Sequence, residues 1–418
     1  MHGRPLSVMS AVVLTLAVSS SALLAPAAAA APTWGPQRSV DTWAWSGGSS
    51  FARTADGDLI ALVATDFSQG GFATDHGPYM GVFARTSSDR GATWSASVRV
   101  SQVNRHADRA ALAVAGGSTY ATWVTQQSYD TYDPSKPRVV FFRANPGSGW
   151  GNTIALTKKK GRVDAPSIAA SGARVYIAWV DANTGQVRVA RSRDGGKTFV
   201  RSVIGKTTAL SPDNEGLRGS ATIGAAGNAV GVAWVASGSG AVKVRVSTNG
   251  GRKWHDSVSV VGALGAANGG TPSLRGWGDK LALAWTTPAG VFSRVWAKTW
   301  GSTRTIASFG PGATYKGGFD VEIVPSEGGG LGAVWSACRT SGCDLLSART
   351  RIDVVWSDSG DGGGTWSPPS LVQGSVHADQ AINESPTAAW LDSGTRMVGY
   401  TGRSAGWTSY AMLLRVGS

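Results

Sequence analysis

Ionisable side chains gather in the longer, irregular segments of this 418-residue chain, between short apolar runs. Five of them stand where an apolar run begins: Arg109, Asp164, Arg218, Asp320 and Glu384. A guanidinium group can hold a carboxylate through two hydrogen bonds, and a carboxyl group can donate or accept a proton during a reaction. Together these residue types favour chemistry on an anionic ligand.

An eight-residue pattern of Ser, Asp, Gly and Thr at alternate positions, ending in an aromatic residue, recurs along the chain. The Asp side chain can accept backbone N–H bonds in a tight turn, Gly permits a positive φ, and the aromatic ring can anchor the turn in a core. We therefore interpret the pattern as a structural turn, with two eroded copies ending at Trp150 and Trp300. Its defining residues are Ser87, Asp89, Gly91, Trp94, Ser192, Asp194, Gly196, Phe199, Ser247, Asn249, Gly251, Trp254, Ser359, Asp361, Gly363 and Trp366.

Short apolar runs accompany every turn at a period of about fifty residues. Residues 163–170 and 175–180 read as two strands joined by a tight turn, 187–190 as a third strand, and a fourth follows the turn, as at 97–100. The 57 glycines and the excess of Asp (22) over Glu (4) also favour turns over helices. We predict an all-β fold, a seven-bladed β-propeller of four-stranded antiparallel blades.

The two ends of the chain suggest how this ring closes. Thr33 and Trp34 resemble the last two residues of a seventh turn, and Ser418 its first. The N-terminal strand 37–40 is then expected to pair with the C-terminal strand 412–415, which removes an open sheet edge.

The repeated turn resembles the Asp-box, or bacterial neuraminidase repeat (BNR repeat), so the chain resembles Asp-box β-propellers of the sialidase-like superfamily. That resemblance implies that the Asp-box turns share one face. The opposite face is then expected to carry the long, irregular segments and the binding site. These segments are 66–79, 126–137, 205–217, 309–319, 337–349 and 373–386.

The superfamily uses three arginines to hold a carboxylate, a Tyr nucleophile assisted by Glu, and an Asp acid/base. The resemblance implies Tyr315, Glu384 and Asp164 as catalytic candidates, and Glu215 beside Arg218 is a rival to Glu384 beside Arg403. The family's Arg-Ile-Pro tripeptide is missing, so whether the chain is an enzyme stays open. The ligand-binding candidates are Arg109, Arg162, Glu215, Arg218, Asp320 and Arg403.

Residues 1–31 read as a secretion signal peptide, with Arg4 ahead of an apolar stretch and small residues at 27–31. The sequence thus predicts a secreted protein with one domain, 32–418, and no transmembrane segment. Cys338 and Cys343 are expected to form a disulfide in an oxidising compartment. No residue pattern indicates a metal site or a cofactor.

The formal charge of +13, with 28 Arg and 11 Lys, favours an anionic partner such as an acidic glycan or a cell-wall polymer. We expect carbohydrate binding, with hydrolysis as an exo-sialidase-like glycosidase left open. One alternative is a non-enzymatic interaction scaffold at the cell surface. Another is a lyase of acidic polysaccharide, with His76, His106 or His377 as base beside Arg109 or Arg218. No aromatic and basic nucleic-acid motif occurs.

Overall fold

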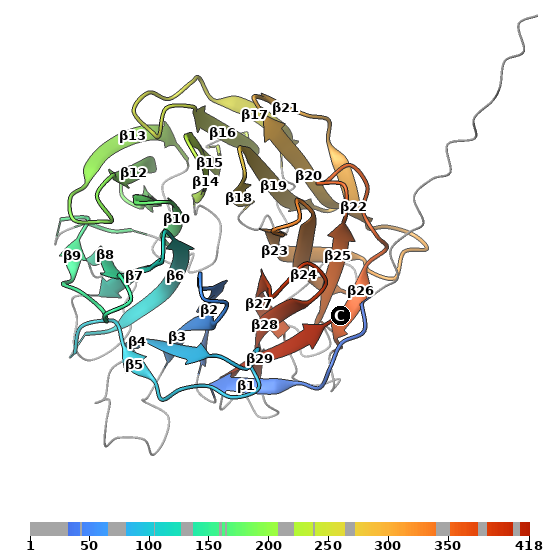
Figure 1. Cartoon of the computed structure of the whole chain (residues 1–418). Coiled ribbons are helices and arrows are strands. Elements are labelled where there is room, and N and C mark those ends of the chain that lie inside the picture. The colour runs from blue at the N-terminus through green and yellow to red at the C-terminus, as the bar shows by residue number, and fades with distance from the viewer. Residues whose placement is uncertain are drawn as a thin grey trace, which may run out of the picture.

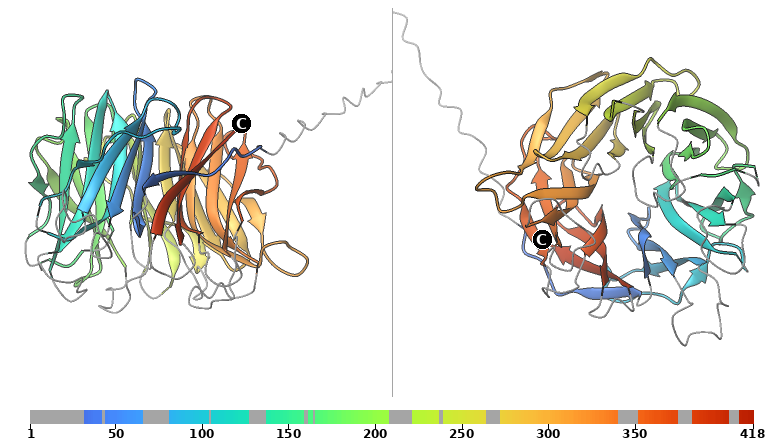
Figure 2. Two further views of the ribbon diagram at one scale, coloured as in Figure 1. Left: turned by 90° about the horizontal axis from the view of Figure 1, so that it is seen from below. Right: turned by 180° about the vertical axis from the view of Figure 1, so that it is seen from behind.

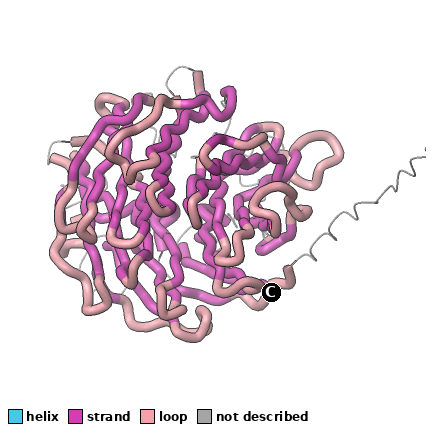
Figure 3. Tube along the Cα trace, turned by 45° about the horizontal axis from the view of Figure 1, so that its top comes forward, coloured by secondary structure: helices cyan, strands magenta, loops and turns pink. Residues whose placement is uncertain are grey.

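The computed structural model describes residues 32–418 except 42–43, 66–80, 104, 127–136, 159–160, 164, 208–220, 237–238, 264–271, 340–351, 375–382 and 404–409. The described chain consists of strands and the loops between them, without a helix (Figure 3). It accordingly holds no helix long and apolar enough to cross a bilayer.

Seven antiparallel sheets stand around one axis like the blades of a propeller, which confirms the predicted fold class (Figure 1). We number the blades 1 to 7 from the sheet that begins with β2. The innermost strands are β2 (Ala44–Arg53), β6 (Ala107–Ala115), β10 (Ser167–Ser171), β14 (Thr222–Ala226), β18 (Ser273–Trp277), β23 (Gly317–Pro325) and β27 (Asn383–Trp390). The second strands are β3 (Leu59–Thr65), β7 (Ser118–Gln126), β11 (Arg174–Asp181), β15 (Ala229–Val235), β19 (Lys280–Thr287), β24 (Leu331–Cys338) and β28 (Arg396–Arg403).

The third and outer strands complete each blade toward the rim, as the view from behind also shows (Figure 2). The third strands are β4 (Gly81–Ser87), β8 (Arg138–Asn145), β12 (Gln186–Ser192), β16 (Ala241–Ser247), β20 (Gly290–Ala297), β25 (Ile352–Ser359) and β29 (Tyr410–Gly417). The outer strands are β5 (Val98–Arg99), β9 (Ile154–Ala155), β13 (Val200–Lys206), β17 (Val258–Ala263), β26 (Ser370–Gln373) and β1 (Arg38–Asp41). In blade 5 two short strands, β21 (Thr299–Trp300) and β22 (Arg304–Ser308), share the outer position.

Apolar side chains from neighbouring blades interleave, so the core is divided among the blade boundaries. A buried aromatic residue of the second strand recurs in these clusters, and Trp123, Trp179, Trp285 and Trp335 are at most 1% exposed. Burying an aromatic side chain removes about 150–250 Å² from water, worth roughly 4–6 kcal/mol. Exposed ion pairs contribute about 1 kcal/mol or less, so these rings dominate the packing of blade on blade.

The N-terminal strand closes the ring, as predicted. β1 pairs with β29, placing Arg38 opposite Leu414 and Ser39 opposite Leu413, and Figure 1 shows this pairing at the rim. Beyond it, the Thr33 N–H donates to the carbonyl of Ser418 at 3.2 Å, and the Ser418 N–H donates back at 3.2 Å. Blade 7 therefore takes its four strands from both ends of the chain.

The repeated turns connect third to outer strands and share one hydrogen-bond pattern. In blade 3 the Ser192 hydroxyl donates to Asp194 Oδ1 at 2.7 Å and accepts from the Gly196 N–H at 2.8 Å. Thr198 donates its N–H and its hydroxyl to the two Asp194 oxygens at 2.9 and 2.6 Å. The blade 1 and blade 6 turns repeat all four bonds.

These turns lie beside the hairpins that join the first and second strands. The Gly195 N–H donates to the Ala173 carbonyl at 2.9 Å, and the Gly250 N–H to the Asn228 carbonyl at 2.8 Å. We call this side of the ring, which carries turns 87–94, 192–199, 247–254 and 359–366, the turn face. The far side is called the opposite face.

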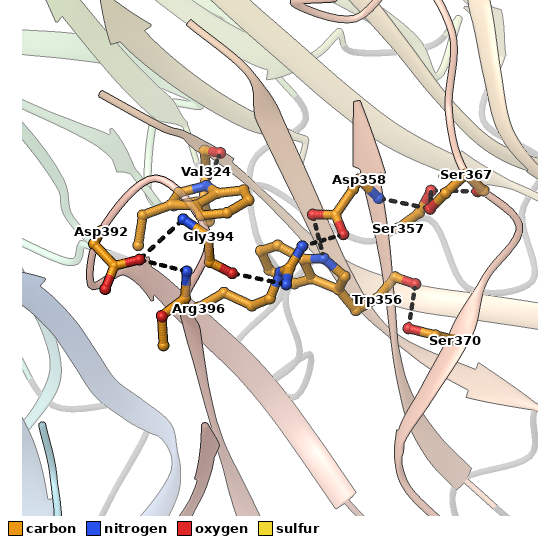
Figure 4. Close-up of polar contacts among 11 residues, drawn as sticks. Val324, Trp356, Ser357, Asp358, Ser367, Ser370, Asp392, Gly394 and Arg396 are labelled. Atoms are coloured by element: carbon orange, nitrogen blue, oxygen red, sulfur yellow. Dashed lines mark hydrogen bonds and ion pairs between the residues drawn. The ribbon is translucent and has the colours of Figure 1, made fainter. Parts of the chain in front are cut away.

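A buried ion pair ties blade 7 to blade 6 near the turn face (Figure 4). Arg396 donates to Asp358 Oδ2 at 2.6 Å, while the indole N–H of Trp356 donates to Asp358 Oδ1 at 2.7 Å. The Arg396 and Asp358 side chains are only 11% and 10% exposed. The guanidinium also lies over the ring of Trp390, 5.1 Å from its centroid. The closing blade is thus fixed by polar contacts as well as by strand pairing.

Candidate functional site

The seven innermost strands enclose a channel along the ring axis. Its cavity in the described chain measures about 310 Å³ and is lined by residues of all seven strands. The lining stretches, such as 112–114 of β6 and 168–170 of β10, lie toward the turn face. Small residues, including Ala113, Ala169 and Ala225, leave this space open on the axis.

Two arginine–carboxylate pairs lie at the channel wall. Arg275 of β18 pairs with Glu322 of β23, whose second oxygen accepts the Ala388 N–H of β27 at 3.2 Å. Arg53 at the end of β2 pairs with Glu327 at 3.0 Å, which connects blade 1 to blade 6. These pairs link blades 5, 6, 7 and 1 and leave this half of the channel polar with balanced charge.

Toward the opposite face, the innermost strands differ around the ring. β2, β6, β23 and β27 each contain a register shift in the half of the strand nearer that face. β10, β14 and β18 pair regularly over all five of their residues. Because a β-bulge bends a strand and redirects a side chain, bulges often accompany binding sites. Blades 6, 7, 1 and 2 are consecutive, so the irregular wall occupies one side of the channel.

Two sequence-predicted residues occupy these bulges. Arg109 has φ 50° and lies within the β6 shift between Asp108 and Ala111, and Asp320 has φ 51° within the β23 shift between Phe319 and Glu322. Left-handed backbone is unfavourable for residues with a Cβ, typically by 1–2 kcal/mol. Both side chains are partly buried. The fold thus holds an arginine and an aspartate in strained positions on the irregular wall.

Tyr315, the predicted nucleophile, directly precedes β23 at the opposite face. Asp353 lies near its hydroxyl, and Arg339 donates to Asp353 Oδ2 at 2.7 Å. Burial, and then the charge of Asp353, raise the Tyr315 pKa to about 12. The phenol is therefore protonated at neutral pH and ionises only if a base accepts its proton. Asp353, whose side chain is 1% exposed, is the carboxylate placed to do so.

This arrangement has the parts of an activated nucleophile: a hydroxyl, a carboxylate near it, and a third group that orients the carboxylate. Lys316 holds the preceding loop, because its ammonium donates to the carbonyls of Gly310 and Ala313 at 3.0 and 2.8 Å. Cys338, which is disulfide-bonded, accepts the Lys316 N–H through its carbonyl at 2.7 Å. The segment that presents Tyr315 is thus anchored on both sides.

The structure describes some of the other predicted site residues only in part. Arg162 lies beside the end of β11, where its carbonyl accepts the Ala182 N–H at 2.9 Å. Glu384 lies opposite Thr401 in blade 7, and Arg403 ends the neighbouring strand β28. Five predicted residues and the expected partner of Cys338 fall outside the described residues, namely His76, Asp164, Glu215, Arg218, His377 and Cys343.

Sequence reasoning missed Asp353 and Arg339, although a signal for the first was present. Asp353 lies in the run Ile352–Ser359, whose residues are all buried. A charged residue is rarely fully buried without a partner, so an Asp inside an apolar strand marks a specific interaction. Nothing in the spacing of Tyr315, Arg339 and Asp353 indicated that they lie close together. Their proximity depends on how β23, β24 and β25 pair in blade 6.

Similarity to known proteins is found at the level of structure. No protein-family model matches the chain, and no curated protein matches it. A Hadza microbial sialidase, Hz136, superposes with a TM-score of 0.52 and 13% identity over 90% of this chain and 66% of its own.

Two further solved structures show the same kind of likeness. A leech intramolecular trans-sialidase superposes with a TM-score of 0.48 and 10% identity over 91% of this chain and 69% of its own. The sialidase of Trypanosoma rangeli, in complex with the inhibitor DANA, superposes with a TM-score of 0.48 and 10% identity over 93% of this chain and 59% of its own. The chain therefore spans less than two thirds of the length of two of these three sialidases. At 13% identity, the likeness to Hz136 supports the β-propeller fold alone, and the activity has to be argued from the site.

Proposed function

We propose that this chain is a secreted, glycan-binding propeller of the sialidase-like superfamily, with Asp-box turns and a binding site where the channel meets the opposite face. The observation that carries the proposal is the one-sided wall of bulged inner strands, with Arg109 and Asp320 in left-handed backbone. Such strain persists where the surrounding structure holds it, and it concentrates at binding and catalytic positions.

The chemistry of the wall suits an acidic sugar. The Arg109 side chain is 15% exposed, and its Nε lies 3.9 Å from the carboxylate of Asp108. A partly dehydrated guanidinium can hold a sugar carboxylate bidentately, while Asp320 can accept sugar hydroxyls. The shared hydrogen bonds of the repeated turns in blades 1, 3 and 6 support the Asp-box assignment, since they fix these turns without involving the opposite face.

The Tyr315–Asp353 pair favours a second candidate function, glycoside hydrolysis. In that reaction Asp353 would accept the phenol proton as the Tyr315 oxygen bonds to the anomeric carbon and the bond to the leaving group breaks. A tyrosine nucleophile suits an anionic sugar, which would repel a carboxylate. The leaving group needs a proton from a separate acid, for which Asp164 is the candidate from the sequence.

Glycan-array binding tests the proposal. The wild type and Arg109→Gln are compared with Arg304→Gln, which removes an equal charge from an exposed residue of the outer strand β22 of blade 5. We expect binding to carboxylated glycans, a loss of tenfold or more in Arg109→Gln, and no change in Arg304→Gln. Equal losses in both variants, or binding to no glycan, would contradict the proposal and favour a protein-interaction scaffold.

Turnover assays then separate the chemical alternatives. Release of the sugar from a fluorogenic sialoside, abolished in Tyr315→Phe and in Asp353→Asn, is the result expected of hydrolysis. Rising ultraviolet absorbance on a uronic-acid polymer would instead indicate a lyase. The candidate base for that reaction is His106, which directly precedes β6, the strand that contains Arg109. Binding without either reaction would identify a lectin.

A further inference from the structure

A cluster of arginines lies on the turn face, over the boundary between blades 3 and 4. Arg174 begins β11, Arg191 lies in β12, Arg193 belongs to the blade 3 turn and Arg252 to the blade 4 turn. The last two are exposed. This basic cluster is on the face of the ring opposite the proposed glycan site.

The blade 4 turn packs directly on this cluster. The Gly250 carbonyl accepts a hydrogen bond from Arg191 at 3.4 Å, and a Cβ built on Gly251 would lie 3.2 Å from the Arg191 Cδ. Arg174 donates to the Gly227 carbonyl at 3.0 Å and to Asn228 Oδ1 at 2.6 Å. The guanidinium groups of both arginines are thus held in place by neutral backbone and amide groups.

No carboxylate neutralises these guanidinium groups within the described chain. Burial first, and then the charges of Arg193 and Arg252, lower the pKa of Arg191, which places the three side chains within electrostatic reach of one another. The nearest turn carboxylate, Asp194, accepts hydrogen bonds from Ser192 and Thr198. By contrast, the blade 1 turn arginine, Arg90, pairs with Asp392 at 3.3 Å.

The blade 4 turn itself has lost its negative charge. Asn249 stands where the other three turns have Asp, and it still accepts the Ser247 hydroxyl at 3.0 Å and the Lys253 N–H at 2.9 Å. Lys253 stands where the others have Thr. Both differences raise the local positive charge while leaving the turn intact. With Arg252, Lys253 forms a pair of adjacent cations at the surface of the turn.

The residues around the cluster favour a polymer over a bilayer as its partner. Membrane-surface sites combine cations with exposed aromatic or aliphatic side chains that enter the lipid. Here the aromatic residues of the two turns face inward: Phe199 lies 5.0 Å from Phe142, centroid to centroid, and Trp254 packs against the core of blades 3 and 4. The cluster spans two blades, and the exposed valines beside it, Val200 opposite Arg191 and Val258 after the blade 4 turn, are short side chains that offer a bilayer little apolar surface.

We propose that this basic cluster is a second binding site, for the sulfate or phosphate ester groups of a polysaccharide. A guanidinium presents two parallel N–H donors to a tetrahedral oxyanion, and exposed cations such as Arg193 and Arg252 can reach successive ester groups. The site acts independently of the channel, so one propeller holds a polyanion on the turn face and its glycan ligand on the opposite face.

Titration calorimetry with dextran sulfate, and with neutral dextran as the matched polymer, tests this site. The double variant Arg193→Gln/Arg252→Gln removes two exposed charges from the cluster. The control, Arg90→Gln/Arg304→Gln, removes two positive charges outside the cluster. One of them, Arg90, belongs to the blade 1 turn and is already paired with Asp392. We expect the cluster variant to lose at least tenfold in affinity, with a weaker dependence on salt, and the control to stay within about twofold of wild type.

Four results would overturn the proposal. Equal losses in the two double variants would mean that net charge alone attracts the polymer. Absence of dextran sulfate binding at low salt, or equal binding of neutral dextran, would remove the site. Tighter binding to phosphatidylserine vesicles than to dextran sulfate, lost in the cluster variant, would assign the cluster to a membrane surface instead.

Discussion

The protonation of Tyr315 gives a direct test of the Tyr315–Asp353 pair. Burial first, and then Asp353, raise the Tyr315 pKa from 10.0 to about 12. Between these two pH values the unfolded chain has lost this proton and the folded chain keeps it. The unfolded state binds fewer protons there, so stability falls as pH rises through the window, and the contribution is complete below pH 10.

The size of the effect follows from the shift. Two pKa units correspond to about 2.7 kcal/mol, and because the phenol is only partly buried, solvent screening reduces this to roughly 1–1.5 kcal/mol. Between pH 10 and pH 12 the wild type should lose this amount of unfolding free energy through Tyr315. Tyr315→Phe lacks the phenol, so its loss over the same range should be smaller by this amount. Asp353→Asn removes the second cause and leaves burial, so its Tyr315 should titrate between the two values.

Urea unfolding at a pH below 10 and at one inside the window measures the first effect, and ultraviolet titration of phenolate measures the second. Tyr400, whose pKa burial also raises to about 12, is present in all the proteins and cancels in the comparison. Two results would show that the environment assigned to Tyr315 is wrong. One is a stability that depends on pH in Tyr315→Phe as it does in the wild type. The other is an ultraviolet titration in which the phenol missing from Tyr315→Phe is one with a pKa near 10.

Two stability predictions address the frame that holds the site. Arg396→Leu leaves the carboxylate of Asp358 buried without its partner and should destabilise the fold by about 3–5 kcal/mol in chemical unfolding, whereas adding Asp358→Leu should recover part of this loss. Losses in the double variant equal to the sum of the two single variants would refute the coupling. Gly196→Ala places a Cβ 2.3 Å from the buried ring of Phe142 and should cost about 2–5 kcal/mol, while Gly195→Ala, with similar backbone but 3.9 Å of space, should cost only about 1–2 kcal/mol. Equal melting temperatures for the two alanine variants would contradict this difference.

The fold was predictable because its signals repeat. Seven copies of one strand pattern gave the blade number, and the match of Thr33 and Trp34 to the end of a turn that Ser418 begins gave the closure. Each blade is a local hairpin unit, so its pairing depends on neighbouring residues. The split outer edge of blade 5 was not foreseen, since Trp300 was read as the end of an eroded turn and instead pairs in β21.

The site was predictable only in part, because it depends on departures from the repeat. Arg109 and Asp320 are predicted as binding residues because they stand at the start of inner strands. No local sequence pattern predicts the bulges that give them a positive φ. The proximity of Tyr315 to Asp353 depends on packing across three strands. The basic cluster was likewise hidden, because Arg174, Arg191 and Arg252 converge from two blades and are separated in the sequence.

Hydrogen–deuterium exchange with a bound carboxylated oligosaccharide, chosen from the glycan array, tests most directly where this protein binds its ligand. The account predicts slower exchange at residues 107–111 of β6 and 317–322 of β23, with no change in turns 192–199 and 247–254. Slower exchange confined to those turns, with the inner strands unaffected, would contradict the proposed binding face.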